Sequence, residues 1–107
     1  MTSKDLEVLM KAVPTIVEWR KVEQGIALRP VNQPALESIV EIPIDLRDKV
    51  WEWLCNPKIV EDVEEWKRLR KPIFQVVLEI VKIMTHYGNT LQREIFSRIL
   101  KELSQSR

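Results

Sequence analysis

The sequence predicts an all-α protein: a compact bundle of about five helices with an irregular or small β-hairpin insertion around residues 26–44. Apolar residues recur at helical spacing through most of the chain. Glycine occurs only twice in 107 residues, which disfavours a turn-rich β fold. Apolar residues make up 45% and charged residues 31% of the chain, a balance that excludes a disordered class.

The length predicts a single helical domain, residues 1–107. One cysteine, Cys55, excludes an internal disulfide and fits a reducing compartment. No signal-like stretch and no run of about 18 apolar residues is present, so we expect a cytoplasmic protein without a membrane partner. Abundant charged residues and little glycine are features of thermophile proteins.

The first helix is predicted from residue 2 or 3 to Gly25, which would act as its C-terminal cap. Pro14 lies inside the apolar pattern without interrupting it, so we expect a kinked helix. The residues that keep the helical register are Leu6, Leu9, Met10, Val13, Ile16 and Val17.

Residues 26–44 contain three prolines, which break any long element. The segment VEIPI alternates between apolar and polar residues, and IALRPV could pair with it as a small hairpin. A short helix that begins at Pro34 is the alternative.

The second and third helices are predicted over residues 46–55, capped by Asp45, and from Asn56-Pro57 to the break at Pro72. The fourth helix follows Pro72 and is apolar nearly all round, so it should be the centre of the core. Only one narrow polar stripe interrupts it: Gln75, Glu79, Lys82 and His86. Gly88 ends this helix.

The last helix is predicted to begin with a capping box made by Asn89 and Gln92. Its expected inner stripe is Leu91, Ile95, Ile99 and Leu103, flanked by Phe96 and Leu100.

No catalytic or metal-binding pattern is present, so we expect a non-enzymatic protein without cofactor, metal or small-molecule substrate. His86 is the only histidine, and with Cys55 it makes no zinc constellation. The acid-x-Lys pattern from Glu65 to Lys67 occurs in nucleases, but there it lies on a strand beside a second acid. Here it falls on a predicted helix.

Charge is distributed unevenly along the chain. Residues 1–66 carry eight basic and thirteen acidic side chains, whereas residues 67–107 carry nine basic and three acidic ones. The predicted helix before Pro72 ends in the basic run Lys67, Arg68, Arg70 and Lys71. Part of this run complements the helix dipole. Contact with a nucleic-acid backbone, a solvated helix end and an acidic protein partner are all open interpretations.

A second basic row, on the last helix, contains Arg93 and Lys101. The predicted nucleic-acid-binding residues are therefore Lys67, Arg68, Arg70, Lys71, Arg93 and Lys101. Trp51 lies about 200° round its helix from Trp53, so the two cannot share a face. Trp51 is either covered by residues 26–44 or exposed as a protein interface.

The segment GNTLQREIFSRILKEL resembles part of the helix-turn-helix of winged-helix regulators. In size, helical class and charge distribution the chain resembles the small helical subunits of type I CRISPR surveillance complexes. This second resemblance implies an antiviral-defence subunit that contacts other protein subunits and holds nucleic-acid strands with Lys and Arg side chains. We therefore expect a non-enzymatic subunit that contacts nucleic-acid backbone. A helix-turn-helix regulator and a protein adaptor without nucleic acid are the alternatives.

Overall fold

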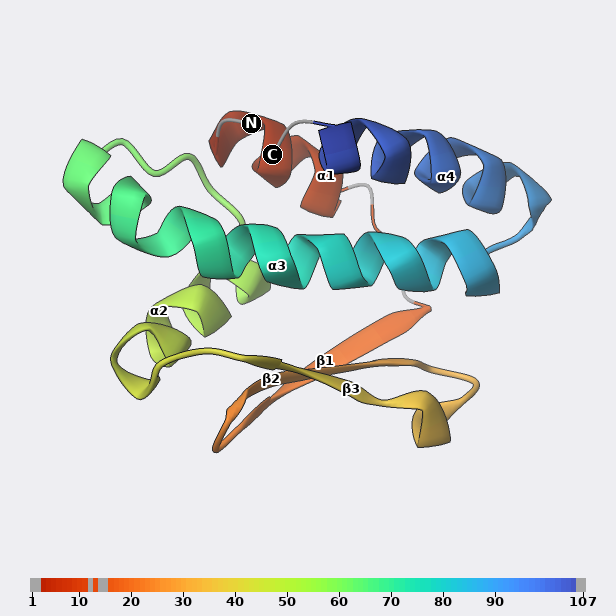
Figure 1. Ribbon diagram of the computed structural model, residues 1–107, viewed down its shortest axis with the longest axis horizontal. Helices are drawn as coiled ribbons and strands as arrows, with labels where there is room; N and C mark the ends of the chain where they lie inside the picture. Colours follow the sequence, from red (N-terminus) through yellow and green to blue (C-terminus); the bar gives the residue numbers. More distant parts are fainter. Residues whose placement is uncertain (1–2, 12, 14–15, 106–107) are drawn as a thin grey trace.

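A computed structural model describes residues 3–11, 13 and 16–105 of the chain (Figure 1). Within these residues a helix is followed by three strands, a short 3-10 helix between the second and third, and then three more helices. The elements are α1 Ser3–Lys11, β1 Val17–Val22, β2 Gly25–Pro30, η1 Pro34–Leu36, β3 Ser38–Glu41, α2 Ile44–Cys55, α3 Val63–Tyr87 and α4 Thr90–Gln105.

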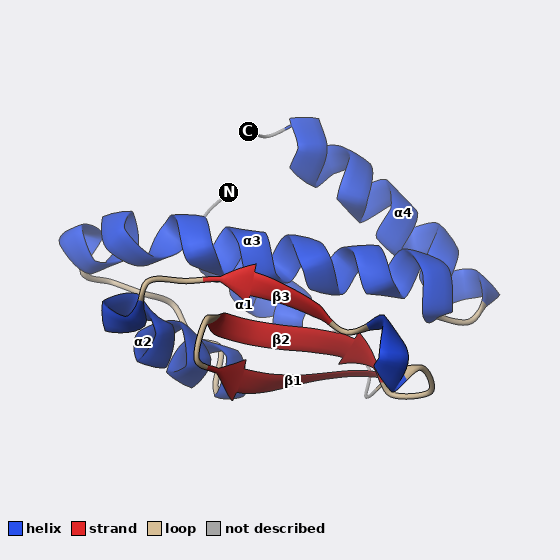
Figure 2. Cartoon of the chain, turned by 60° about the horizontal axis from the view of Figure 1, so that its bottom comes forward, coloured by secondary structure: helices blue, strands red, loops and turns tan. Residues whose placement is uncertain are grey.

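The three strands form an antiparallel meander in the order β1-β2-β3 (Figure 2). Ile26 of β2 pairs with Val40 of β3, and Leu28 of β2 pairs with Trp19 of β1. Because successive side chains of a strand point to opposite faces, Ile26, Leu28 and Val40 all lie on one face. All three are buried, so this face of the sheet closes the core.

Helix α3 runs along the sheet and contacts β1, β2 and the other three α-helices. In Figure 1 the sheet and α2 lie on one side of α3, and α1 and α4 lie on the other. This central position explains why α3 buries side chains on several sides, in agreement with the predicted core helix. Its buried residues are Leu69, Pro72, Ile73, Val76, Val77, Leu78, Ile80, Val81, Ile83 and Met84.

The all-α helical bundle of about five helices is wrong, because the described residues form four α-helices and a three-stranded sheet. The error begins at the first helix, which ends at Lys11 instead of continuing to Gly25. Residues 17–22 read VEWRKV, a sequence whose β-branched and aromatic residues also suit a strand, and pairing with β2 decides for the strand. Pro14 lies outside the described residues.

The predicted hairpin in residues 26–44 is confirmed in its pairing, because β2 pairs with β3, but its second strand is Ser38–Glu41 and not residues 40–44, since Ile44 already belongs to α2. It is part of the main sheet, however, and not an insertion into a helical bundle. The alternative helix at Pro34 is present as well, as the 3-10 turn η1 in the connection between the two strands. The hairpin and the short helix are both present because the helix lies in the connection between the two strands.

The third and fourth predicted helices are one helix, α3, with Pro72 inside it. Proline removes one backbone hydrogen bond of a helix. Here its ring is buried in the core, so packing offsets that loss. The helix begins at Val63 and not at Pro57, because Asp62 is the N-cap: its Oδ1 accepts a hydrogen bond from the backbone N–H of Glu65 at 3.1 Å.

Two other predictions about helix ends have different outcomes. Asp45 does not cap α2; the N-cap is Pro43, with no side-chain hydrogen bond. The capping box of α4 is confirmed. Gln92 Oε1 accepts from the Asn89 backbone N–H at 2.9 Å, and Asn89 Oδ1 accepts from the Gln92 backbone N–H at 2.8 Å.

The inner stripe predicted for the last helix is displaced. Phe96 is buried, and Ile99 and Leu100 are half-buried against the core. Leu91 and Ile95, predicted inside, are 65% and 44% exposed. The reason is that α4 has only α3 as a substantial neighbour, and one helix covers only a narrow stripe of another.

Gly25 is required where the β1–β2 hairpin passes close to β3. Its φ is +156°, and an added Cβ would lie 2.0 Å from the carbonyl oxygen of Val40. We expect Gly25→Ala to lower the free energy of unfolding by at least about 2 kcal/mol, because strand β3 must move away. Urea unfolding measures this. Gln24→Ala, at the exposed neighbouring turn residue, is the control and should change stability little. Equal stability of the two variants would show that β3 yields without cost.

Candidate nucleic-acid interface

One row of polar side chains follows the exposed side of α3 over most of its length. The row begins at Arg68 and Lys71 and continues, at spacings of three and four residues that share a helix face, through Gln75, Glu79, Lys82 and His86. All of these except the half-buried Glu79 are exposed. Arg68 and Lys82 are 14 residues apart, which corresponds to about 21 Å along the helix axis.

The helix divides the basic run between two directions. Arg68 and Lys71 are three residues apart and belong to the α3 row. Lys67 and Arg70 are also exposed but lie about 100° away from their row neighbours. Lys67 is the only one of the four with an ion pair among the described residues, at 3.5 Å from Glu64 Oε1. The run is therefore not one patch.

A second row lies on α4. Arg93, Ser97 and Lys101 are each four residues apart and all three are exposed. The Ser97 hydroxyl donates a hydrogen bond to the Arg93 carbonyl oxygen at 2.6 Å, so it is satisfied within the helix. Within the described part of the chain, the Ser97 hydroxyl therefore makes no hydrogen bond to the side chain of Arg93 or Lys101.

The two rows lie on the same side of the hairpin made by α3 and α4. The helices are antiparallel (Figure 1). Phe96 is buried and α3 is the main neighbour of α4, so we infer that the Phe96 face of α4 packs on α3. Turning by about 100° per residue from that contact brings both rows to the side on which β3 lies. Gln75, in the middle of the α3 row, lines an open pocket of 610 Å³ with Ile39 and Glu41 of β3.

We name this surface the basic face, made up of Arg68, Lys71 and Lys82 of α3 and Arg93 and Lys101 of α4. The antiparallel course of the helices places Arg93 near the Lys82 end, just after the turn at Gly88. Lys101 lies further back, toward Lys71. The structure therefore brings four of the six predicted nucleic-acid-binding residues to one face. Lys67 and Arg70 lie beside it.

The cations of the basic face differ from those of the sheet in their pairing. Among the described residues, the side chains of Arg68, Arg70, Lys71, Arg93 and Lys101 form no hydrogen bond or ion pair. Lys82 contacts Glu79 Oε1 at 3.2 Å. Unpaired cations on a rigid helix are free to bind an anion from outside the chain.

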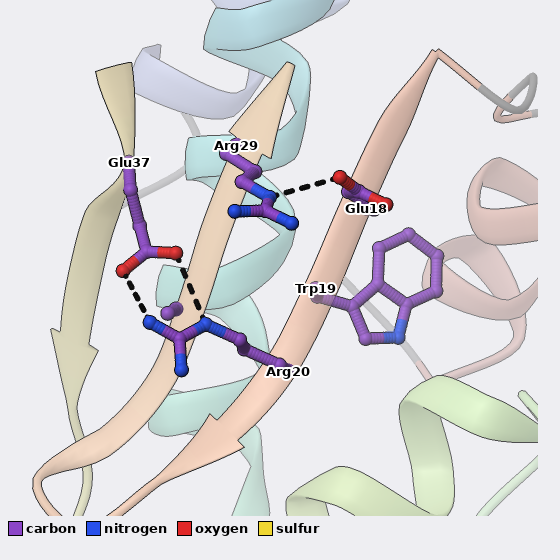
Figure 3. Close-up of a pocket in the computed structure, with 6 residues that line it drawn as sticks. Glu18, Trp19, Arg20, Arg29 and Glu37 are labelled. Atoms are coloured by element: carbon purple, nitrogen blue, oxygen red, sulfur yellow. Dashed lines mark hydrogen bonds and ion pairs between the residues drawn. The ribbon is translucent and has the colours of Figure 1, made fainter. Parts of the chain in front are cut away.

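The outer face of the sheet, by contrast, neutralises itself (Figure 3). Arg20 reaches across Ala27 and binds both carboxylate oxygens of Glu37, at 2.9 and 3.1 Å. Hydrogen bonding to Arg20 lowers the pKa of Glu37, and the Glu37 hydrogen bond raises the pKa of Arg20. Arg29 donates to Glu18 Oε1 at 2.8 Å. Both arginines of this group, Arg20 and Arg29, are therefore already paired with a carboxylate.

Trp51, the predicted interface residue, is half-buried and packs against the core. It lines an open groove of 630 Å³ formed by α2, the following segment and the start of α3. The groove also contains the exposed Ile59 and Cys55, with Glu61 and Lys58 at its sides. Trp51 thus lies between the two predicted states: it is neither fully covered nor fully exposed.

Lys82 is the basic-face residue that the sequence did not assign to binding. It was visible as part of the polar stripe of residues 75–86. The stripe joins Arg68 and Lys71 only if the helix continues through Pro72, and a proline normally predicts a break. The polar stripe was therefore visible in the sequence, but the helix break predicted at Pro72 separated it from Arg68 and Lys71.

Among the described residues there is no group of three or more His, Cys, Asp or Glu side chains placed to hold a metal ion. Within the same part of the chain, no helix has both the length and the apolar character needed to cross a membrane. No family model, curated protein or solved structure matches this chain. Because no similar protein suggests a function, we base the functional proposal on the unpaired cations of the basic face.

Proposed function

We propose that this protein binds the sugar-phosphate backbone of a nucleic acid through its basic face, as a non-enzymatic subunit of a larger nucleoprotein complex. The proposal rests on one observation: four cations of the basic face are left without a partner in the described part of the chain. Arg68, Lys71, Arg93 and Lys101 share one side of a helical hairpin and have no partner among the described residues. Phosphate oxygens are the acceptors that such side chains bind in nucleic acids.

The dimensions of the basic face suit a polyanion better than a single small anion. Its α3 row extends for about 21 Å. One strand of B-form DNA advances about 3.4 Å per phosphate, so this length corresponds to about six phosphates. Three cations of the basic face lie along this length on α3, and Arg93 and Lys101 of α4 add two more beside it, so the face could neutralise most of those charges. A free phosphate or a nucleotide would reach only a small part of the face.

The same surface gives no sign of base-specific recognition. Its cations project from the sides of two helices that pack on each other. Contacts of this kind position a protein on nucleic acid but carry no sequence information. A base-specific preference would favour the helix-turn-helix regulator instead, and loss of all nucleic-acid binding would favour the protein adaptor.

The proposed role is that of a subunit in a larger complex, as the resemblance to CRISPR small subunits implies. The Trp51 groove lies at the opposite end of α3 from Arg93 and is a separate surface, in which apolar side chains such as Trp51 and Ile59 lie among charged ones. A protein neighbour in the groove and a nucleic acid on the basic face could be bound at the same time. A single exposed cysteine, Cys55, suits the cytoplasm as the place where such a complex works.

The salt dependence of binding tests the proposal. Fluorescence anisotropy with labelled oligonucleotides of several sequences should show a log affinity that falls linearly with log salt concentration. Five phosphate contacts predict a slope of about −3.5 to −4.5, equal for all sequences. Binding that is insensitive to salt, or absent for both DNA and RNA at low salt, would contradict a phosphate-binding function.

A further inference from the structure

The basic face ends at an exposed pair of aromatic rings. His86 follows Lys82 by four residues and so belongs to the α3 row. It is exposed, and the neighbouring Tyr87 is 38% exposed. Their ring centroids are 6.3 Å apart with the planes at 67°, an edge-to-face arrangement.

Neither ring contributes to the hydrophobic core formed by the described residues. Tyr87 does not belong to that core, but it is more than half covered, so the pair offers one partly exposed ring beside the exposed His86. Two cations are near it in the fold: Lys82, which pairs with Glu79, lies one turn before it on α3, and Arg93 lies in the first turns of α4, directly after the connecting turn. The Arg93 backbone N–H donates to the Asn89 carbonyl oxygen at 2.9 Å, which keeps this part of α4 helical and close to the turn.

We propose that the basic face takes a single-stranded nucleic acid, with at least one base stacked on the Tyr87–His86 pair. This inference rests on the function proposed above and names its substrate class. In a duplex the faces of the bases are covered by their neighbours, so an aromatic ring at the protein surface gains nothing from them. In a single strand every base offers a free face, and stacking on it is largely independent of sequence.

The arrangement combines the two elements that single-strand binding requires. Arg68 and Lys71 contact phosphates at one end of the path, and Lys82 and Arg93 contact phosphates at the other. His86 continues the α3 row past this second group, and Tyr87 lies about 100° further round the helix, at the border of the basic face, where a base of the same strand can reach it. Cations alone would bind single strands and duplexes alike, since both carry phosphates.

The test compares binding of a single strand of about 15 nucleotides with binding of the duplex of the same sequence. This length is near the upper limit of the site that one single-strand-binding domain covers. The wild-type protein should bind the single strand more tightly. Tyr87→Leu should weaken single-strand binding by roughly 5- to 150-fold, the range expected for one stacked base. Duplex affinity and the salt slope should not change, because no phosphate contact is removed. Tyr87→Phe keeps the ring and should bind like wild type.

The outcomes separate this inference from the proposed function. Equal affinity for single strand and duplex, or wild-type binding of the single strand by Tyr87→Leu, would overturn the inference. Salt-dependent binding of both nucleic acids would then still support the phosphate-binding function. If neither is bound at low salt, both are wrong. Circular dichroism of Tyr87→Leu should match wild type, because Tyr87 lies outside the core.

Discussion

Val77→Asp should prevent stable folding. Val77 is 0% exposed and lies on α3, which contacts the sheet and the other three α-helices. An aspartate there would bury a carboxylate in an apolar core, at a cost that makes charge burial exceptional in proteins. We expect the free energy of unfolding to fall by at least about 4 kcal/mol, a large part of the stability of a small domain.

Thermal unfolding followed by circular dichroism measures this loss. Gln75→Asp is the matched control, because it places the same residue on the same helix but at an exposed position two residues away. Its effect should stay within about 1 kcal/mol. A Val77→Asp protein that unfolds at the temperature of the control would show that α3 is not the centre of the core.

Reversing the charges of Arg68 and Lys71 to glutamate should weaken nucleic-acid binding more than the same reversal of two exposed cations outside the basic face. Each phosphate contact that is lost reduces the salt slope by about 0.7 to 0.9, so the double variant should lose about 1.4 to 1.8. Affinity at low salt should fall by roughly a hundredfold, because repulsion replaces attraction. Base preference should not change, and helicity should survive because both side chains are exposed.

Two control variants carry the same change in charge. Lys67→Glu with Arg70→Glu alters the other half of the basic run, off the α3 row, and should have a smaller effect. Lys4→Glu with Lys58→Glu alters two exposed lysines outside the basic face and should affect binding least. If all three double variants lose affinity equally, only net charge matters and the basic face has no special role.

The sequence predicted the start of α4 correctly, where two nearby side chains decide it, but it placed the N-caps of α2 and α3 at the wrong residues. The capping box at Asn89 depends on two side chains three residues apart, so it could be read without tertiary information. The apolar residues of 73–84 are buried in the structure, apart from the half-buried Phe74, because so continuous an apolar pattern can only lie inside. The pairing of β2 with β3 was suggested by alternation in VEIPI, with IALRPV as its possible partner.

The errors occurred where two structures satisfy the same local pattern. Val17 and Trp19 are two residues apart, a spacing that fits one face of a strand, whereas Trp19 and Val22 are three apart, a spacing that fits one face of a helix. Only the backbone pairing with β2 distinguishes them, and pairing is a contact between distant parts of the chain. Pro72 is a second example, because its effect on the helix depends on whether tertiary packing offsets the lost hydrogen bond.

The candidate site shows the same division. By itself the sequence determined that cations concentrate after residue 66, that they follow rows on helices, and that no metal or catalytic constellation was to be expected. Only the tertiary structure decided which rows face the same way, since that depends on α3 continuing through Pro72 and on α4 returning antiparallel along it. Local periodicity sets the face of each helix on which a charge lies. The packing of one helix against another sets the direction in which that face points.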